Sequence, residues 1–229
     1  MSSGRQPSGP AGAPSAGPIT PAVRPAAPGD VGALAETAAS AFADYPWTRW
    51  IVDADDHAER LRGLYAIHLD VALRFGEVWM ADDASGVAAW TWSPAEQRQA
   101  AYLAEAGLLA RLAALAGARA QNVERADALL SPHVPAEPHW CLAAVAVRPD
   151  AQRRGLATRL LAPVLARCDT EGHSARLETS SPDNVRLYER LGFRTHAEVD
   201  VPEGPHVWLM LRQPTTGGRR SGCDLRDLT

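Results

Sequence analysis

The feature that most constrains the fold is an uncharged apolar run followed by a loop that contains glycine. The run covers residues 140–147 and shows no polar alternation, so it predicts a strand that is buried on both faces. Pro149 ends this strand, and the apolar residues between 154 and 168 recur at the spacing of a helix with one buried face. A buried strand that leads through a short loop into such a helix indicates a mixed α/β domain.

The loop between this strand and this helix has the composition of an anion-binding turn. Gly155 and Ala157 are small, so a ligand can approach the main chain closely. The first N–H groups of the following helix lack intrahelical partners and carry the positive end of the helix dipole, which suits a pyrophosphate. Arg153 and Arg154 would add positive charge. The loop has neither the Gly-Lys-Ser/Thr of a P-loop nor the three glycines of a dinucleotide-binding turn.

Helices and strands alternate along the rest of the chain. Asp30 is expected to cap a helix over 31–43, and Pro46 to end that region. A helix over 56–75 has Leu64 and His68 at the spacing of its apolar face, and Gly76 is expected to close it. Further helices are predicted over 94–117, 121–130 and 184–191, and strands over 22–26, 77–81, 87–92, 176–179, 193–201 and 206–211. The strand over 22–26 contains proline, which restricts it to a sheet edge.

The length of 229 residues fits one sizeable domain with short extensions. Residues 1–19 are rich in proline, alanine and glycine, and we expect this tail to be disordered. Residues 20–212 form the predicted folded domain. Residues 213–229 are polar and are predicted to form a flexible C-terminal tail.

Charge and cysteine content argue against several classes of function. The 23 basic and 27 acidic residues give a net charge of −4, which argues against nucleic-acid binding. Cys141, Cys168 and Cys223 show no zinc-binding spacing, so we expect no metal and a reducing compartment. No secretory signal is expected, and no apolar run reaches the roughly 18 residues of a membrane span. These features predict a cytoplasmic protein without a membrane partner. The sequence does not distinguish a monomer from a homodimer.

Two motifs resemble those of one enzyme superfamily. Gln152–Ala157 matches the acyl-CoA loop Q/R-x-x-G-x-G/A of the GNAT N-acetyltransferases, and Asn184–Phe193 matches their second signature, N-x-x-x-Y-x-x-x-G-F. The resemblance implies a mixed α/β fold with a twisted, mostly antiparallel sheet of six to seven strands flanked by helices. It also implies that the buried strand carries a bulge and splays from a parallel neighbour, with acetyl-CoA bound in the opening.

The resemblance also assigns the residues that would bind acetyl-CoA. Main-chain groups of Val145 and Val147 would bind the pantetheine arm like an added strand, and the N–H groups of residues 153–158 would bind the pyrophosphate. Asn184 could contact CoA, or it could only cap its helix. The expected cofactor-binding residues are Val145, Ala146, Val147, Gln152, Arg153, Arg154, Gly155, Leu156, Ala157, Thr158, Asn184 and Tyr188.

The implied reaction is direct transfer of an acetyl group from a thioester to an amine. Tyr188 occupies the position of the superfamily's usual general acid, and a phenol with a pKa of about 10 is a suitable proton donor to a leaving thiolate. Alternatively, Tyr188 packs in the core or only positions the thioester.

The predicted buried strand contains no acid that could serve as the base. Glu178, at the end of the next strand, is the candidate, with Asp44 and His139 in reserve. Glu178 could instead be a solvated or ion-paired carboxylate. An α-amino group, with a pKa of about 7.7–8.0, is partly neutral at pH 7 and would need no dedicated base.

Aromatic residues gather in two regions that members of this superfamily use for the acceptor. Trp90 and Trp92 are two residues apart, so they point to one face of their strand. Asp44 would attract the cation of a flat or bulky amine. Each tryptophan could instead pack in the core, and Cys141 is expected to be a small core residue. The expected substrate-binding residues are Asp44, Tyr45, Trp47, Trp90, Trp92 and Glu178.

Four further segments resemble the puromycin-acetylating members of the superfamily: Ala41–Pro46, Val78–Asp83, Leu177–Ser180 and Val201–Pro205. The resemblance runs from about 22 to 212, weakens between 97 and 129, and departs at Ala157, where these members have glycine. It implies an aminonucleoside antibiotic such as puromycin, or a toxic amine of similar shape, as acceptor. The alternatives are a protein or peptide N-acetyltransferase and a non-catalytic acyl-CoA-binding regulator.

Overall fold

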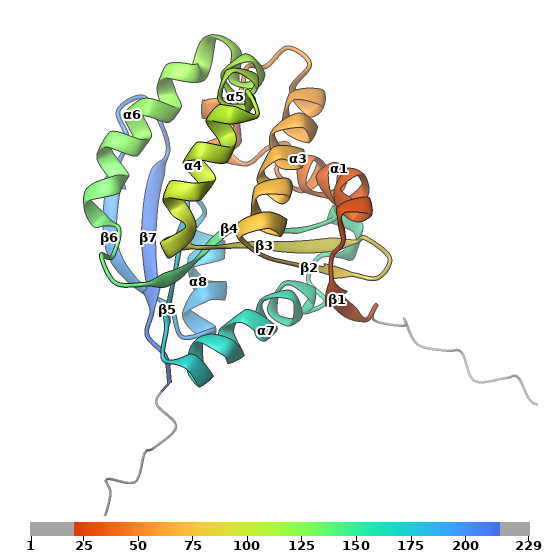
Figure 1. Cartoon of the computed structure of the whole chain (residues 1–229), viewed down its shortest axis with the longest axis vertical. Helices are drawn as coiled ribbons and strands as arrows, with labels where there is room; N and C mark the ends of the chain where they lie inside the picture. The colour runs from red at the N-terminus through yellow and green to blue at the C-terminus, as the bar shows by residue number, and fades with distance from the viewer. Residues whose placement is uncertain (1–20, 216–229) are drawn as a thin grey trace, which may run out of the picture.

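A twisted sheet forms the centre of the molecule, and helices cover both of its faces (Figure 1). The structure, a computed structural model, describes residues 21–215. Within this part of the chain the sheet has seven strands in the order β1-β2-β3-β4-β5-β7-β6. The strands are β1 (Val23–Pro25), β2 (Gly76–Ala81), β3 (Gly86–Trp92), β4 (His139–Val147), β5 (Ser174–Thr179), β6 (Arg194–Asp200) and β7 (His206–Arg212).

One pair of neighbouring strands is parallel, and the other pairs are antiparallel. Strands β4 and β5 run in the same direction but pair only from His139–Ser174 to Leu142–Leu177. On its other side β4 pairs with β3 as far as Val147, with a register shift between Ala89 and Trp90. The predicted fold class, with a bulged central strand that leaves its parallel neighbour, is therefore confirmed.

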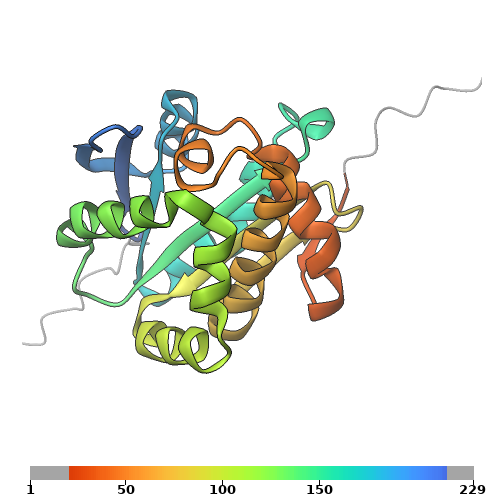
Figure 2. The same ribbon diagram turned by 90° about the horizontal axis from the view of Figure 1, so that it is seen from above.

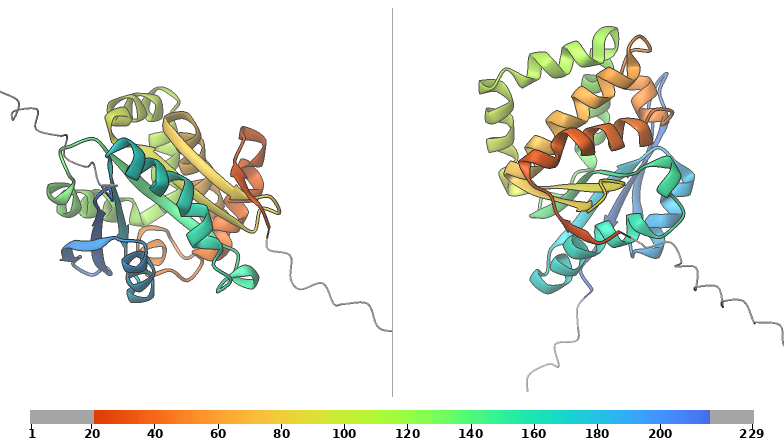
Figure 3. Two further views of the ribbon diagram at one scale, coloured as in Figure 1. Left: turned by 90° about the horizontal axis from the view of Figure 1, so that it is seen from below. Right: turned by 90° about the vertical axis from the view of Figure 1, so that its right-hand side faces the viewer.

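Two of the three hydrophobic clusters among the described residues hold helices against the two faces of the sheet. The first lies under α1 and α3 and includes Leu34, Leu61 and Val87. The second lies under α7 and includes Leu160, Leu177 and Phe193. Figure 2 shows α3 crossing above the sheet, and Figure 3 shows α7 beneath it. The helices are α1 (Val31–Ala41), α2 (Pro46–Ile51), α3 (His57–Phe75), α4 (Glu96–Glu105), α5 (Leu108–Ala116), α6 (Ala120–Leu130), α7 (Leu156–Glu171) and α8 (Pro182–Arg190).

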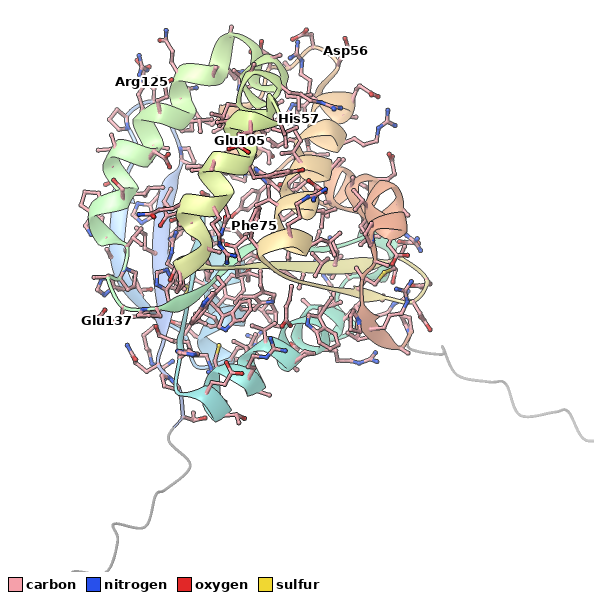
Figure 4. All side chains as sticks on the ribbon, in the orientation of Figure 1. Asp56, His57, Phe75, Glu105, Arg125 and Glu137 are labelled. Carbon is pink, nitrogen blue, oxygen red and sulfur yellow. The ribbon has the colours of Figure 1, made fainter. Side chains whose placement is uncertain are left out.

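Several predicted boundaries were wrong for local reasons. Pro46 does not end a helical region but opens α2, because its fixed φ suits the first helical position. The helix predicted over 94–117 breaks into α4 and α5 at Gly107, whose φ is +66°. Figure 4 labels Glu105, the last residue of α4 before this break.

Two expected capping roles also differ. Asp30 makes no side-chain cap to α1, because its carboxylate accepts from Ala27 N–H and Arg24 instead. Gly76 does not close α3 in a left-handed conformation; it begins β2, where an added Cβ would lie 2.0 Å from the carbonyl oxygen of Trp90. Its small size, rather than its flexibility, is therefore what this position requires.

The ends of the described chain agree with part of the sequence interpretation. Strand β1 is an edge strand beside β2, as its proline predicted. The predicted disordered tail, and the C-terminal tail beyond residue 215, lie outside the described residues.

No single helix within residues 21–215 is long and apolar enough to cross a membrane, although one bent pair, Ser93–Glu105 with Leu108–His133, meets that test jointly by length and composition. The same residues hold no group of three or more His, Cys, Asp or Glu placed to bind a metal ion.

Candidate active site

The strand that leaves its neighbour opens a cavity beside the glycine-containing loop. Beyond Leu142 the β5 side of β4 has no ladder partner, so its main-chain groups can bind an extended ligand like an added strand. We call this space of about 600 Å³ the loop cavity. Its lining includes Val145, Ala146 and Val147 on β4.

The loop turns sharply before α7 and leaves main-chain donors exposed. Arg153 and Gly155 have φ values of +62° and +74°, and the Gln152 side chain donates to Val147 O at 3.0 Å, which ties the loop to β4. The first helical bond runs from Arg159 N to Gly155 O, so the N–H groups of residues 156–158, which line the loop cavity, have no intrahelical partner. No atom lies within 4 Å of a Cβ built on Gly155. The loop thus has the open, donor-rich geometry of a pyrophosphate site.

Most of the residues predicted to bind the cofactor line the loop cavity. Arg154 is the exception, since it is exposed and does not line the cavity. Asn184 lines it from within α8, where Ser181 takes the cap position; its Nδ2 donates to Thr179 Oγ1 at 3.3 Å. The predicted residues that line it are Val145, Ala146, Val147, Gln152, Arg153, Gly155, Leu156, Ala157, Thr158, Asn184 and Tyr188. Tyr45, predicted for the acceptor, lines it too, and the sequence did not predict the remaining lining residues: Ala41, Phe42, Ala151, Ser181, Asp183, Leu187 and Arg190.

A second space, the inner cavity, lies on the α3 side of the sheet and measures about 200 Å³. Much of its wall is aromatic: Phe42, Tyr45, Trp47 and Tyr65. Phe42 stacks on Tyr65 with ring centroids 5.1 Å apart and meets Tyr45 edge-on at 5.4 Å. The wall therefore suits a flat or partly apolar group.

The two cavities meet at one place. Phe42, Tyr45, Val145, Asn184 and Tyr188 line both of them. A ligand in the loop cavity and a ligand in the inner cavity would therefore approach each other beside Tyr188.

Tyr188 is buried at this junction. Its ring meets Phe193 edge-on at 5.8 Å, which fixes it against the second core. Two effects raise the pKa of Tyr188 above its usual value: burial, which is the larger, and the charge of a nearby ionised Tyr45. The phenol is therefore protonated at neutral pH and can act as a proton donor, as a general acid must.

Tyr45 is held in place by hydrogen bonds to the end of β5. Its hydroxyl lies 2.9 Å from Thr179 Oγ1 and accepts from Ser180 N–H at 2.6 Å. These bonds hold the segment before α2 against the end of β5. The position of the junction therefore depends on a contact between residues more than 130 apart in sequence.

Polar side chains enter the inner cavity from β4 and β5. Glu178 lines it, and its Oε1 accepts from Arg176 Nη1 at 2.7 Å. The Arg176 Nε is buried without a partner among the described residues. Cys141 also lines the cavity, and burial raises the pKa of its thiol, so it stays protonated. Cys141 was predicted to be a small core residue, but it belongs to none of the hydrophobic clusters of the described residues and lines the cavity instead.

The predicted substrate-binding residues divide into two groups. Tyr45, Trp47 and Glu178 line the inner cavity. Asp44 does not; its side chain is 91% exposed and pairs with Arg49. Trp90 is fully buried in the core under α7, and Trp92 packs against that core.

The two reserve candidates for the base lie apart from the cavities. His139 is 2% exposed, and its Nδ1 lies 2.8 Å from Glu137 O. Neither His139 nor Asp44 lines the inner cavity.

His68 is one of the polar residues of the inner cavity that the sequence did not predict as part of the site. It projects from α3 into the wall of the inner cavity, where it meets Tyr65 edge-on with centroids 6.0 Å apart. Burial lowers the pKa of His68. The indication in the sequence was a histidine among leucines on an otherwise apolar helix face.

Comparisons with known proteins agree with this geometry. A model of the acetyltransferase (GNAT) family matches residues 64–193, more than half of the chain. A solved structure titled histone acetyltransferase HPA2 and related acetyltransferase, from Corynebacterium glutamicum, is 25% identical, covers 86% of this chain and 98% of that chain, and has a TM-score of 0.64.

Two further solved structures share the fold at lower identity. Arylalkylamine N-acetyltransferase 2 from Aedes aegypti is 13% identical with a TM-score of 0.54, over 85% of this chain and 99% of that chain. An agmatine N-acetyltransferase is 19% identical with a TM-score of 0.51, over 84% of this chain and 98% of that chain. Together with the splayed strands and the donor-rich loop, the family match identifies the chain as a member of the GNAT family of acetyl-CoA-dependent N-acetyltransferases.

Proposed function

We propose that this enzyme acetylates the amine of a small molecule in a ternary complex. The observation that carries the proposal is the meeting of the loop cavity and the inner cavity at Tyr188. The inner cavity is small and walled by aromatic rings, which favours a compact acceptor over a folded protein. An aminonucleoside antibiotic such as puromycin, or a toxic amine of similar shape, is the acceptor class that we propose from the sequence resemblance. Acetylation would remove the ammonium charge and so inactivate such a compound.

The loop cavity has the groups that acetyl-CoA requires. Main-chain groups of Val145 and Val147 would bind the pantetheine arm, and the N–H groups after Gly155 would bind the pyrophosphate. Arg153 lines the cavity and would add positive charge, whereas Arg154 would act only at its rim. When bound, acetyl-CoA supplies the acetyl group as an activated thioester.

We propose Tyr188 as the general acid. Its phenol is protonated, buried and placed where the two cavities join. It would donate its proton to the thiolate sulfur as that sulfur leaves, which makes departure easier.

Glu178 has two proposed roles, as the base and as the group that binds the ammonium. Its bond to Arg176 favours the second role, because the guanidinium holds the carboxylate in one orientation. The other carboxylate oxygen would accept from an ammonium in the inner cavity, whose wall also includes Tyr45 and Trp47.

Release of CoA from acetyl-CoA in the presence of single amines tests this function. Puromycin is the first acceptor, and puromycin aminonucleoside, which lacks the aminoacyl group, is its matched control. We expect turnover with puromycin and little with the control. Turnover of other small amines but not of puromycin would support the proposed reaction and contradict the proposed antibiotic acceptor. Turnover only with peptides, or acetyl-CoA binding with no acceptor, would reject the small-molecule function in favour of a protein acetyltransferase or a regulator.

A further inference from the structure

The inner cavity holds one side chain that can take a proton at neutral pH and that has no role in the reaction described so far. We propose that His68 is the catalytic base, which removes a proton from the acceptor ammonium before attack. The proposal rests on the proposed function, because it requires a small amine in the inner cavity.

The geometry of α3 directs His68 into that cavity. Leu64 and His68 are four residues apart and therefore lie on one helix face, and both line the cavity. The ring of Tyr65 stands edge-on to the imidazole at an interplanar angle of 86°, which holds the imidazole from the side. The His68 side chain is half-buried and lines the cavity wall, so the imidazole is accessible to a ligand in the cavity.

The surroundings keep the imidazole neutral. Burial alone lowers the pKa of His68, and no hydrogen bond or charge from a described residue adds to the shift. The titratable and charged groups that share the cavity wall are Tyr45, Tyr65, Cys141, Arg176, Glu178 and Tyr188. The elements packed against α3 also carry titratable or charged groups, none of which lines the inner cavity. Three of these groups are bonded to other residues: Glu36 to Arg62, Tyr102 to Asp70, and Glu77 to Arg167. The others are Glu96, Arg98 and Glu105 on α4 and Arg111 on α5.

The other polar groups of the cavity are less suited to the task. Glu178 is held by Arg176, and the Tyr45 hydroxyl is bound to Thr179 and Ser180. Cys141 and Tyr188 are protonated and cannot accept. Arg176 is a cation. The neutral imidazole is thus the base that the described wall provides.

The proton balance is complete with the residues at hand. His68 takes one proton from the ammonium, and the freed lone pair on nitrogen forms the bond to the acetyl carbon as the carbon–sulfur bond breaks. The electron pair of that bond goes to sulfur, which takes the proton of Tyr188. The second proton on nitrogen restores the phenol through water, and His68 releases its proton to solvent.

The test compares kcat/KM across pH for the unchanged enzyme, His68→Gln and His196→Gln, using the best amine of the panel. His196 is an exposed histidine on β6 and serves as the matched control. His68→Gln can use only amine that is already neutral in solution. Its kcat/KM should therefore rise tenfold per pH unit up to the pKa of the amine. The unchanged enzyme and His196→Gln should be flat above the pKa of His68.

We expect a loss of about 100-fold near pH 7 for an alkylamine, shrinking to less than about tenfold near pH 9. Parallel profiles for His68→Gln and the unchanged enzyme would overturn the role of His68 while leaving the small-molecule function intact. If the unchanged enzyme acetylates no small amine, the proposed function fails, and the role of His68 fails with it.

If His68→Gln does not fold, a second measurement on the unchanged enzyme tests the proposal. The NMR titration of His68 in the unchanged enzyme should have the same midpoint as the acidic limb of kcat/KM, below the ordinary histidine value of about 6.5. Different midpoints would overturn the proposal.

Discussion

The two cavities that meet at Tyr188 are built in opposite ways. The loop cavity takes just over half of its lining residues from one continuous strand–loop–helix segment, β4 to α7, whose main-chain groups are the proposed ligands of the cofactor. The inner cavity is made of side chains from α2, α3, β4, β5 and α8, which lie far apart in the sequence. Main-chain groups are the same whatever the side chain, so the first design suits a constant cofactor. The second can change one side chain at a time, so it suits a variable acceptor.

The largest expected effect lies where the cavities join. Tyr188→Phe removes the proton donor but keeps the ring against Phe193. We expect kcat to fall by about 100-fold, with the Kd for acetyl-CoA unchanged. Steady-state kinetics and calorimetric titration check this. An unchanged kcat would eliminate the acid role and leave Tyr188 as a packing residue.

The next prediction distinguishes acetyl-CoA binding in the loop cavity from the stability of α7. Gly155 and Gly172 both have positive φ, at the two ends of α7, and both have open space around them. Gly155→Ala and Gly172→Ala should each lower the free energy of unfolding by about 1–2 kcal/mol. Only Gly155→Ala should also weaken acetyl-CoA binding, by about tenfold. Equal Kd values for the two variants would contradict the main-chain design of this cavity.

A smaller effect is expected from the carboxylate of the inner cavity. Glu178→Gln keeps the shape of the side chain but removes the charge that we propose attracts the ammonium. Because Glu178 is partly exposed, we expect only about a fivefold rise in KM for the amine, with little change in kcat. A large loss of kcat with an unchanged KM would instead show Glu178 to be the base, and would count against His68.

The smallest kinetic effect distinguishes two tryptophans. Trp47 lines the inner cavity, whereas Trp90 is fully buried under α7. Trp47→Phe should change the KM for the amine by about two- to threefold with little loss of stability. Trp90→Phe should lower the free energy of unfolding by about 1 kcal/mol and leave KM unchanged. A change in the KM for the amine in Trp90→Phe would indicate that Trp90 contributes to acceptor binding after all.

The loop cavity could be predicted from the sequence because its determinants are local. Gly155 requires a left-handed conformation, the loop before α7 exposes N–H groups, and the apolar run 140–147 requires a central strand. The motif around Tyr188 placed that residue on a helix, which the structure confirms. These conclusions needed no knowledge of what lies across the fold.

The inner cavity could not be predicted, because its walls come from separate elements. The spacing of Trp90 and Trp92 predicted that they share a face, and they do. It could not tell which face, because β3 is covered on both sides. The position of Asp44 beside Tyr45 likewise did not reveal that its side chain turns to solvent and Arg49.

The sequence by itself therefore determined the family, the mixed α/β fold, the donor-rich loop and the tyrosine on α8. Only the tertiary structure decided which side chains meet the acceptor. The physical reason is range: main-chain geometry follows from the residues of one segment, whereas the inner cavity depends on how α2 and α3 pack over the splayed strands. His68 illustrates the difference, since a histidine on a helix acquires a role only from what faces it across the fold.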